Sequence, residues 1–317
     1  MKNKLRIVFY GTPDFAVESL DAILKAGFEV CAVVTAPDRK SGRGMKLSPS
    51  AVKSFALQKG IDILQPTNLK SEEFAQQLSQ YNPNIQVVIA FRMMPEKVWN
   101  YPEHGTINLH ASLLPNYRGA APINWAVING ETETGVTTFR LKHEIDTGNI
   151  LRQQAVEISQ EDTAGTMHDR LMTVGADLMV STLNDIAAGT AVETAQIISE
   201  TVRKAPKIFK QHCEIDWSLN AKQVFNLIRG LSPYPVARTK IGGKTLKVFS
   251  SEIIERSRGN EQAGSFASDN KSYIHVACAD QYLSLTMVQL EGKRRMNIDE
   301  FLRGFDITQE PQQLGDY

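Results

Sequence analysis

Residues 5–13 read LRIVFYGTP, a short apolar run that breaks at a glycine-threonine-proline turn. Apolar residues then recur at helical spacing through Phe15, Leu20 and Ile23. An unbroken apolar run of this length favours a buried strand, and the spacing after the turn favours an amphipathic helix. The opening therefore predicts a strand, a tight turn and a helix.

The same alternation continues along the first half of the chain. Strands are expected at 30–34, 61–64 and 85–90, with helices at 50–59 and 71–81. Each parallel crossover needs a connection long enough to hold a helix. The pattern therefore predicts an α/β fold with a doubly wound, mostly parallel, Rossmann-like sheet. Ligands on such sheets bind at the carboxyl ends of the strands.

Two further segments of this half differ from that alternation. Residues 35–49 contain Gly, Pro and several cations but no apolar face, which predicts a long mobile loop with a function. Residues 167–187 carry apolar side chains on one helical face, and Gly189 follows as a stop. One long amphipathic helix is expected there.

The last third of the chain is typical of a second, β-rich domain. A helix is expected at 221–231, and residues 238–254 alternate around the hairpin signal Gly242-Gly243. Further strands are expected at 273–278 and 283–288, so a small OB-like β-barrel is the simplest closure. The predicted organisation is a catalytic domain at 1–189, a linker at 190–207 and a C-terminal barrel at 208–317.

Composition excludes several classes of protein. The 317 residues carry 35 Lys and Arg against 35 Asp and Glu, so net charge gives no sign of a nucleic-acid partner. Three scattered cysteines cannot form a disulfide framework or zinc ribbon, which fits a reducing cytoplasm. The histidines lack the spacing of metal ligands, which argues against a metal hydrolase. The first turn lacks the G-x-G-x-x-G of dinucleotide-dependent oxidoreductases. The N-terminal apolar run is too short for a membrane span. We expect a cytoplasmic monomer with no metal and no membrane partner.

The densest group of candidate catalytic residues follows residue 105. Asn108 and His110 are two apart, so in a strand they project to the same face, and Asp146 precedes a tight turn that can return to that cleft. An amide, an imidazole and a carboxylate suit metal-free acyl transfer to an amine, because the oxyanion needs a fixed donor and protons must move. Taken singly, each residue is as easily explained as a strand cap, a backbone partner or a turn residue.

Three motifs together make this region resemble the folate-dependent formyltransferases. They are the segment 108–115, NLHASLLP; the segment 117–122, YRGAAP; and Asp146-Thr147-Gly148. The resemblance implies 10-formyltetrahydrofolate as the co-substrate and assigns catalysis to Asn108, His110 and Asp146. It assigns folate contact to Ser112, Leu113, Leu114 and Pro115. One departure is the segment 91–95, FRMMP, where many relatives have Tyr-Gly before the aliphatic residues, so the local shape of the pterin pocket stays open.

The acceptor is indicated by features outside that region. The opening 8–15, the loop 37–49 and the segments 215–218 and 232–235 resemble those family members that formylate methionyl initiator tRNA. Cations on the loop and in the second domain can contact phosphates. The candidate tRNA-binding residues are Arg39, Lys40, Arg43, Lys46, Lys207, Lys210, Lys244 and Lys247.

Two alternatives remain open from the sequence. A formyltransferase acting on an amino-sugar nucleotide accounts for the chemistry but not for the cationic loop and tail. A non-catalytic RNA-binding protein accounts for the cations but not for the clustering of Asn108, His110 and Asp146. Folate binding and salt-dependent tRNA affinity discriminate among the three.

Overall fold

The computed structural model of the protein describes residues 4–41, 46–311 and 313–315. Internal contacts divide the chain into two compact units. Unit 1 comprises Met1–Gly119, Thr134–Glu157 and His168–Lys204, and unit 2 comprises Ala120–Glu133, Ile158–Met167 and Ala205–Tyr317. The division into a catalytic domain that ends at residue 189 and a tRNA-binding domain that begins at residue 208 stays a prediction.

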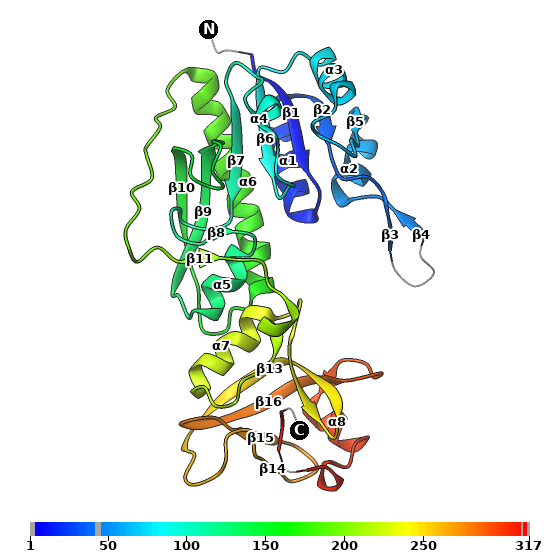
Figure 1. The fold of residues 1–317 in the computed structure, drawn as a ribbon, viewed down its shortest axis with the longest axis vertical. Coiled ribbons are helices and arrows are strands. Elements are labelled where there is room, and N and C mark those ends of the chain that lie inside the picture. Colours follow the sequence, from blue (N-terminus) through cyan, green and yellow to red (C-terminus); the bar gives the residue numbers. More distant parts are fainter. Residues whose placement is uncertain (1–3, 42–45, 312, 316–317) are drawn as a thin grey trace. The chain divides into compact units, whose positions relative to one another are not determined.

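Unit 1 is built on a seven-stranded sheet in the order β10-β9-β7-β6-β1-β2-β5 (Figure 1). Its strands are β1 (Arg6–Gly11), β2 (Glu29–Val34), β5 (Ile63–Leu64), β6 (Ile85–Ile89), β7 (Thr106–His110), β9 (Glu133–Arg140) and β10 (Ile150–Glu157). The strands from β7 to β5 pair in parallel, whereas β9 pairs antiparallel to β7. The predicted Rossmann-like, mostly parallel sheet is confirmed.

Helices cover both faces of this sheet. They are α1 (Asp14–Lys25), α2 (Ala51–Lys59), α3 (Glu72–Gln80), α4 (Glu96–Trp99) and α6 (Ala164–Ala188), the last of which begins in unit 2. Phe74 of α3 and Val98 of α4 join the core formed with Val8 and Tyr10 of β1. The predicted long helix ends as expected, with Gly189 at a left-handed φ of 71°.

The alternation of β7 places the polar residues of this strand on one face. Asn108 lies level with Val88 of β6, which packs in the α3 and α4 core, so Asn108 and His110 share that face. Leu109 projects to the other face, where Gly175 of α6 approaches it so closely that a Cβ would lie 2.8 Å from a Leu109 methyl carbon. The polar pair therefore ends a buried strand at the carboxyl edge of the sheet.

The expectation of an irregular loop over 35–49 was wrong in part. β3 (Arg39–Ser41) and β4 (Lys46–Ser48) pair antiparallel. At the base of this hairpin, Lys53 donates to Asp38 at 2.7 Å and Nε2 of Gln65 donates to Asp38 at 2.9 Å, and these two hydrogen bonds lower the pKa of the Asp38 carboxyl. A two-stranded ribbon held by backbone bonds buries no apolar face, so hydrophobic periodicity could not indicate it.

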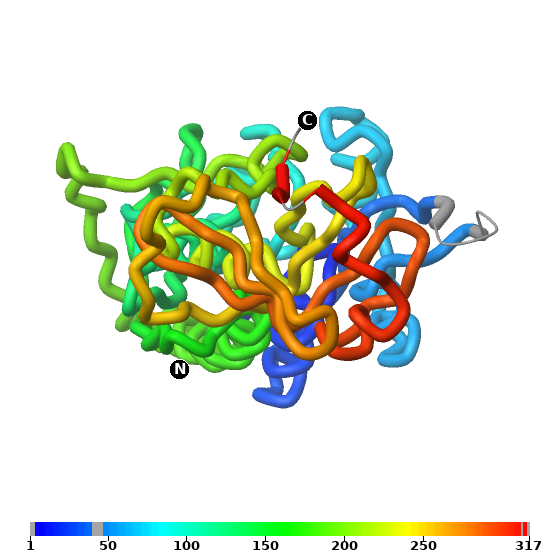
Figure 2. Tube along the Cα trace, turned by 90° about the horizontal axis from the view of Figure 1, so that it is seen from below, coloured from blue at the N-terminus to red at the C-terminus, as the bar shows by residue number. Residues whose placement is uncertain are grey.

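Unit 2 contains an antiparallel sheet that follows the path β12-β13-β16-β15-β14, with β17 beside β16. The strands are β12 (Ala237–Ile241), β13 (Lys244–Ser257), β14 (Phe266–Ser268), β15 (Ile274–Ala277), β16 (Gln281–Leu290) and β17 (Met296–Asn297). Register shifts along β13 bend this long strand, and the curvature of the sheet is visible in Figure 2. The predicted β-rich second domain and its hairpin at Gly242 and Gly243 are confirmed, with both glycines at positive φ.

The remaining elements are short apart from one helix. They are α5 (Pro122–Ile128), α7 (Ala221–Leu231), α8 (Ile298–Arg303), β8 (Arg118–Gly119), β11 (Lys204–Ala205) and the 3-10 turns η1 (Lys210–Cys213) and η2 (Ile307–Gln309). The bounds of α7 agree with the helix predicted at 221–231.

Three separate stretches of sequence fold together in unit 2. Asn124 of α5 donates to the carbonyl of Gly230 in α7 at 2.8 Å. The buried Arg229 guanidinium donates to the carbonyls of Ser159 and Asp162, both at 2.9 Å. Burial lowers the pKa of Arg229, although it remains a cation. The Arg229 guanidinium of α7 therefore connects residues 158–167 to this helix through hydrogen bonds to backbone carbonyls.

Candidate active site

His110 lies at the carboxyl end of β7 with both ring nitrogens engaged. Its Nε2 lies 2.8 Å from the carbonyl oxygen of Tyr117, and its Nδ1 lies 3.8 Å from Oδ2 of Asp146. A carbonyl only accepts, so Nε2 carries a proton and Nδ1 is the nitrogen that can exchange one. The imidazole and the carboxylate are only 9% and 13% exposed, so water screens this pair weakly.

Asp146 is held in an unusual backbone conformation at a turn. Its φ is 55°, in the left-handed region, and its Oδ2 accepts a hydrogen bond from the backbone nitrogen of Gly119 at 2.9 Å. Gly148 completes the turn, because a Cβ there would lie 1.5 Å from the carbonyl oxygen of Arg140. The turn therefore returns the carboxylate to His110 and admits no side chain at residue 148.

Asn108 is half-buried one step before His110 on the same face of the strand. Within residues 4–41, 46–311 and 313–315 its carboxamide has no hydrogen-bond partner. The structure thus brings His110 and Asp146 into contact and leaves an amide donor beside them.

The predicted folate-contacting segment forms a rigid turn. Ser112 is fully buried and donates to the Asn116 carbonyl at 2.6 Å, while its own carbonyl accepts from Thr137. Leu114 is also buried, and its carbonyl accepts from Gln153 at 2.9 Å. Leu113 and Pro115 are half-buried. Ser112 and Leu114 therefore hold the turn itself, and the folate contacts of this segment remain a prediction.

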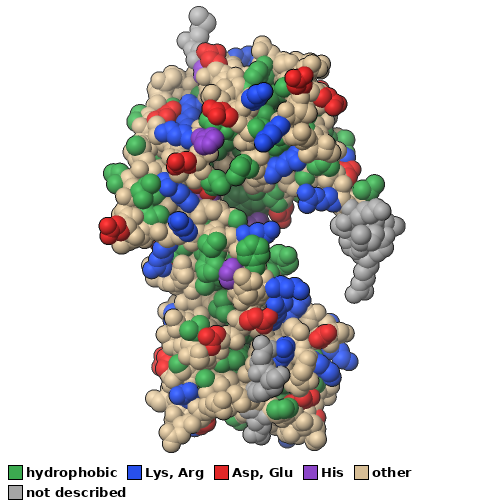
Figure 3. Space-filling view, in the orientation of Figure 1, with side chains coloured by type: hydrophobic (Ala, Val, Ile, Leu, Met, Phe, Trp, Pro, Cys, Tyr) green, Lys and Arg blue, Asp and Glu red, His purple; other side chains and the backbone are tan. Residues whose placement is uncertain are grey.

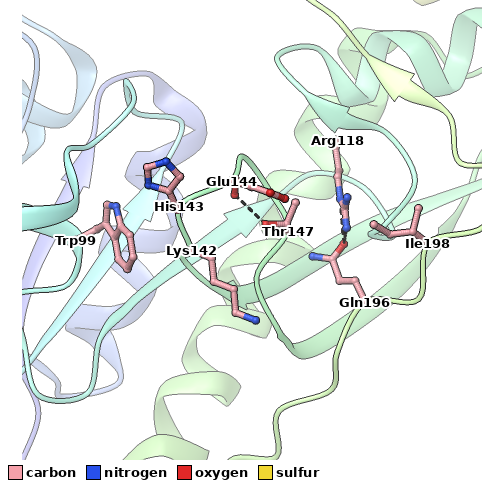
Figure 4. A pocket seen from close by; sticks show the side chains of 8 residues that line it. All are labelled: Trp99, Arg118, Lys142, His143, Glu144, Thr147, Gln196 and Ile198. Carbon is pink, nitrogen blue, oxygen red and sulfur yellow. Dashed lines mark hydrogen bonds between the residues drawn. The ribbon is translucent and has the colours of Figure 1, made fainter.

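A pocket of about 530 Å³ opens beside the Asp146 turn within unit 1. Figure 4 shows Trp99 and His143 at one end, Arg118, Gln196 and Ile198 at the other, and Lys142, Glu144 and Thr147 between them. It offers an indole ring, cations and a carboxylate, which is the mixed lining typical of small-molecule sites.

Residues 91–95, the segment that departs from the family pattern, also belong to unit 1. The Arg92 guanidinium donates to the backbone carbonyls of Pro66 and Thr67 and lies over the Phe91 ring, 5.7 Å from its centre. Met94 is buried, whereas Met93 is 75% exposed. Arg92 thus anchors this segment to the connection that contains Pro66 and Thr67, and no carboxylate in the described part of the chain pairs with it.

The candidate tRNA-binding residues are distributed over separate elements. Arg39 is exposed on β3; Lys40 and Lys46 lie in the hairpin strands with side chains that are not described, and Arg43 falls outside the described residues. In unit 2, Lys207 and Lys210 are exposed near η1, with the Lys207 ammonium 5.7 Å from the centre of the half-exposed Phe209 ring. Lys244 and Lys247 are exposed on β13.

The surface charges are mixed on the face drawn in Figure 3, where Lys and Arg alternate with Asp and Glu. Among the described residues no group of three or more His, Cys, Asp or Glu is placed to hold a metal ion. No helix in that part of the chain is long and apolar enough to cross a membrane.

Sequence reasoning missed the groups that position the catalytic candidates. The Tyr117 carbonyl and the Gly119 backbone nitrogen fix His110 and Asp146, but backbone atoms leave no compositional trace. Gln196 was also missed, because it lies in a polar stretch without periodicity.

Two family models match the chain in order. The formyl transferase model matches residues 5–183, and the formyl transferase C-terminal domain model matches residues 207–306. The chain belongs to the formyltransferase family.

Curated relatives cover almost the whole chain and are named methionyl-tRNA formyltransferase. The chain is 48% identical over 316 residues to that of Bacteroides thetaiotaomicron, covering 97% of this chain and 98% of the relative. It is 51% identical over 314 residues to that of Parabacteroides distasonis, covering 96% and 97% respectively.

Solved structures of lower identity share the fold. A sugar 3N-formyltransferase, WlaRD, solved with dTDP and 5-N-formyl-THF, has a TM-score of 0.67 at 20% identity and covers 92% of this chain and 100% of that one. HypX from Aquifex aeolicus, solved with tetrahydrofolic acid, has a TM-score of 0.62 at 17% identity, covering 95% of this chain and 48% of that one. Both structures contain folate derivatives.

Proposed function

We propose that the protein transfers the formyl group of 10-formyltetrahydrofolate to the amino group of methionyl initiator tRNA, giving N-formylmethionyl-tRNA for translation initiation. The observation that carries the proposal is the placement of His110 between the Tyr117 carbonyl and the Asp146 carboxylate, with Asn108 beside it. The 45–51% identity to methionyl-tRNA formyltransferases supports this acceptor.

Each of the three side chains has a distinct role. The Asn108 amide donates a hydrogen bond to the formyl oxygen as negative charge develops there. Nδ1 of His110 takes the proton that the attacking amine loses, because Nε2 is committed to the Tyr117 carbonyl. The protonated ring then gives this proton to the donor's nitrogen as the bond between that nitrogen and the formyl carbon breaks and tetrahydrofolate leaves. The Asp146 carboxylate, 3.8 Å away, stabilises the imidazolium that results.

The pocket beside the Asp146 turn fits the folate donor. The Trp99 indole offers a flat aromatic surface to a pterin ring, the Glu144 carboxylate is an acceptor for ring amino groups, and Lys142 offers a cation. When bound, the donor supplies the activated formyl carbon. Ser112, Leu113, Leu114 and Pro115 do not line this pocket, so their contact with the folate is proposed from the family resemblance alone.

The tRNA is proposed to bind through phosphate contacts outside this pocket. Arg39, Lys40 and Lys46 belong to the strands of the β3–β4 hairpin, and Arg43 lies between these strands in the sequence. Residues 208–317 with the adjoining Lys207 carry the other candidate lysines. These cations contact phosphates and so position the acceptor end, and they make no contacts with base edges. Contacts with phosphates generally fix the position of a nucleic acid without recognising its sequence. In this account residues 1–189 perform the chemistry, residues 190–207 link the two domains, and residues 208–317 bind tRNA. Methionyl-tRNA is used in the cytoplasm, so we propose a cytoplasmic location, and we propose a monomeric state.

The experiment offers one donor to several acceptors. The full-length protein receives 10-formyltetrahydrofolate with methionyl initiator tRNA, methionyl elongator tRNA, uncharged tRNA, free methionine or a dTDP-amino sugar, and each product is identified by mass. Formylation of methionyl initiator tRNA alone is expected. Formylation of the sugar instead would retain the chemistry and refute the acceptor, and transfer to none would refute the proposed function.

A further inference from the structure

Gln196 lies in a segment predicted as a linker, yet its side chain contacts the candidate catalytic turn. Its Nε2 donates to the carbonyl of Asp146 at 2.9 Å and to the carbonyl of Gly148 at 2.7 Å. Its Oε1 accepts from Nε of Arg118 at 3.1 Å and from the same guanidinium's terminal nitrogen at 2.5 Å. One carboxamide therefore joins the Asp146 turn to Arg118.

Arg118 of β8 lies between two residues whose backbone atoms contact the catalytic candidates. Its neighbour Tyr117 accepts from His110, and its other neighbour Gly119 donates to Asp146. Segment 117–119 and turn 146–148 are thus linked directly through Gly119 and indirectly through Gln196.

The Asp146 backbone needs such a restraint. A left-handed φ is unfavourable for a non-glycine residue, so the turn retains this conformation only if surrounding contacts hold it. The two carbonyls bonded by Gln196 flank the turn at both ends, which fixes its backbone independently of the Asp146 side chain.

The segment carrying Gln196 is itself anchored on both sides. Before it, Thr194 exchanges two backbone hydrogen bonds with Ile150. After it, Tyr117 donates from its backbone nitrogen to the Arg203 carbonyl at 2.7 Å. Gln196 is therefore presented from a fixed backbone, as a positioning side chain must be.

From these contacts we infer that Gln196 is a positioning residue, which sets the distance between Asp146 and His110 through the backbone of the turn. The inference rests on the proposed function for its effect on rate. It assigns part of the catalytic geometry to residues 193–203, which sequence patterning marks only as a connection.

Two substitutions and one control separate this role from a general structural one. Gln196→Met keeps the length but removes every hydrogen bond; Gln196→Glu keeps an acceptor for Arg118 but cannot donate to the two carbonyls. Ser199→Ala is the matched control, because Ser199 lies on the same segment and its hydroxyl bonds only to the hydroxyl of Thr201 among the described residues.

The first measurement needs no substrate. In protein labelled with ¹⁵N-glycine, exchange of the Gly119 amide reports whether the Asp146 carboxylate still accepts its hydrogen bond. We expect faster exchange in both Gln196 variants and wild-type exchange in Ser199→Ala. Wild-type exchange in Gln196→Met would overturn the inference whether or not the protein formylates tRNA.

The second measurement is steady-state formylation with both substrates varied. We expect kcat to fall roughly 10- to 100-fold in both Gln196 variants, with the KM for methionyl-tRNA within about twofold of wild type, because misplacement of a catalytic group lowers turnover more than binding. The KM for the folate donor is not used as a criterion, because Gln196 lines the pocket proposed for that donor. We also expect the pH profile of kcat in Gln196→Met to follow that of Asp146→Asn. A lower melting temperature with unchanged kcat would show a structural role only and overturn the inference. Inactivity of the wild type would refute the proposed function. In that case the exchange of the Gly119 amide alone decides whether Gln196 positions the Asp146 turn.

Discussion

Oδ2 of Asp146 lies 3.8 Å from Nδ1 of His110 and accepts a hydrogen bond from the Gly119 backbone nitrogen. The carboxylate is therefore held by the backbone and faces the imidazole without a direct hydrogen bond to it. Nδ1 therefore has no direct hydrogen bond to the carboxylate, while the carboxylate lies close enough to stabilise a protonated ring. The relationship between these two side chains is the centre of the proposed mechanism.

Replacing Asn108 with alanine tests the proposed oxyanion donor. The amide is half-buried and has no partner in the part of the chain that the structure describes, so its loss should leave the fold intact. We expect kcat for methionyl-tRNA to fall about 100- to 1,000-fold with an unchanged melting temperature. Stopped-flow formylation and thermal unfolding measure the two quantities, and a kcat within about threefold of wild type would remove Asn108 from the mechanism.

Much of the fold follows from hydrophobic periodicity. The strands β1, β2, β6 and β7 and the helices α6 and α7 bury continuous or one-sided apolar surfaces, which the sequence displays directly. The β3–β4 hairpin buries no such surface. The grouping of residues 120–133 and 158–167 with unit 2 depends on polar contacts such as that of Arg229 with distant carbonyls, which no local pattern reveals.

Arg229→Met should destabilise unit 2. The substitution preserves volume but removes the donor to the carbonyls of Ser159 and Asp162. Loss of a buried carbonyl's partner costs about 1–3 kcal/mol, so we expect the free energy of unfolding to fall by roughly 2–4 kcal/mol in urea titration.

The matched control for this change is Arg294→Met. Arg294 is 74% exposed and pairs with Glu300 on the surface of the same unit, and such pairs contribute up to about 1 kcal/mol. If the two substitutions destabilise the protein equally, the assignment of Arg229 to the core of unit 2 is wrong.

Neutralising the candidate lysines should weaken tRNA binding in a salt-dependent way. For Lys207, Lys210, Lys244 and Lys247, each change to glutamine should reduce the slope of log affinity against log salt by about 0.7–0.9 if that lysine contacts a phosphate. Filter binding at several salt concentrations measures the slope. Lys59→Gln is the control, because Lys59 pairs with Asp21 in unit 1, and its slope should match wild type. A wild-type slope in all four variants would contradict the proposed RNA surface.

Cys278 gives a probe of unit 2 that depends on pH. Burial, with a smaller effect of Asp280, raises the pKa of this thiol from 9.0 to about 12. The thiolate is the reactive form, so at pH 8 we expect alkylation of Cys278 only through unfolding. The unfolded chain ionises more readily, so the stability that the neutral thiol contributes is full below pH 9 and is lost as the pH rises toward 12. Mass spectrometry of alkylated protein checks this, and rapid labelling of the folded protein at pH 8 would contradict the burial.

The candidate site was only partly visible in the sequence. Spacing indicated that Asn108 and His110 share a strand face, and the turn signal after Asp146 suggested its return. The contacts that fix them, through Tyr117, Gly119 and Gln196, combine backbone atoms with a side chain some fifty residues from the turn it holds. Such contacts depend on tertiary structure and carry no periodic signal.

The most direct test of the mechanism compares wild type with Asp146→Asn in a single turnover. Excess enzyme, saturated with 10-formyltetrahydrofolate, is mixed with methionyl initiator tRNA, and formylmethionine is measured over time. The asparagine can still accept from Gly119 but carries no charge, so we predict a rate at least about 100-fold lower with unchanged tRNA affinity. A wild-type rate in Asp146→Asn would contradict the role of the carboxylate beside His110.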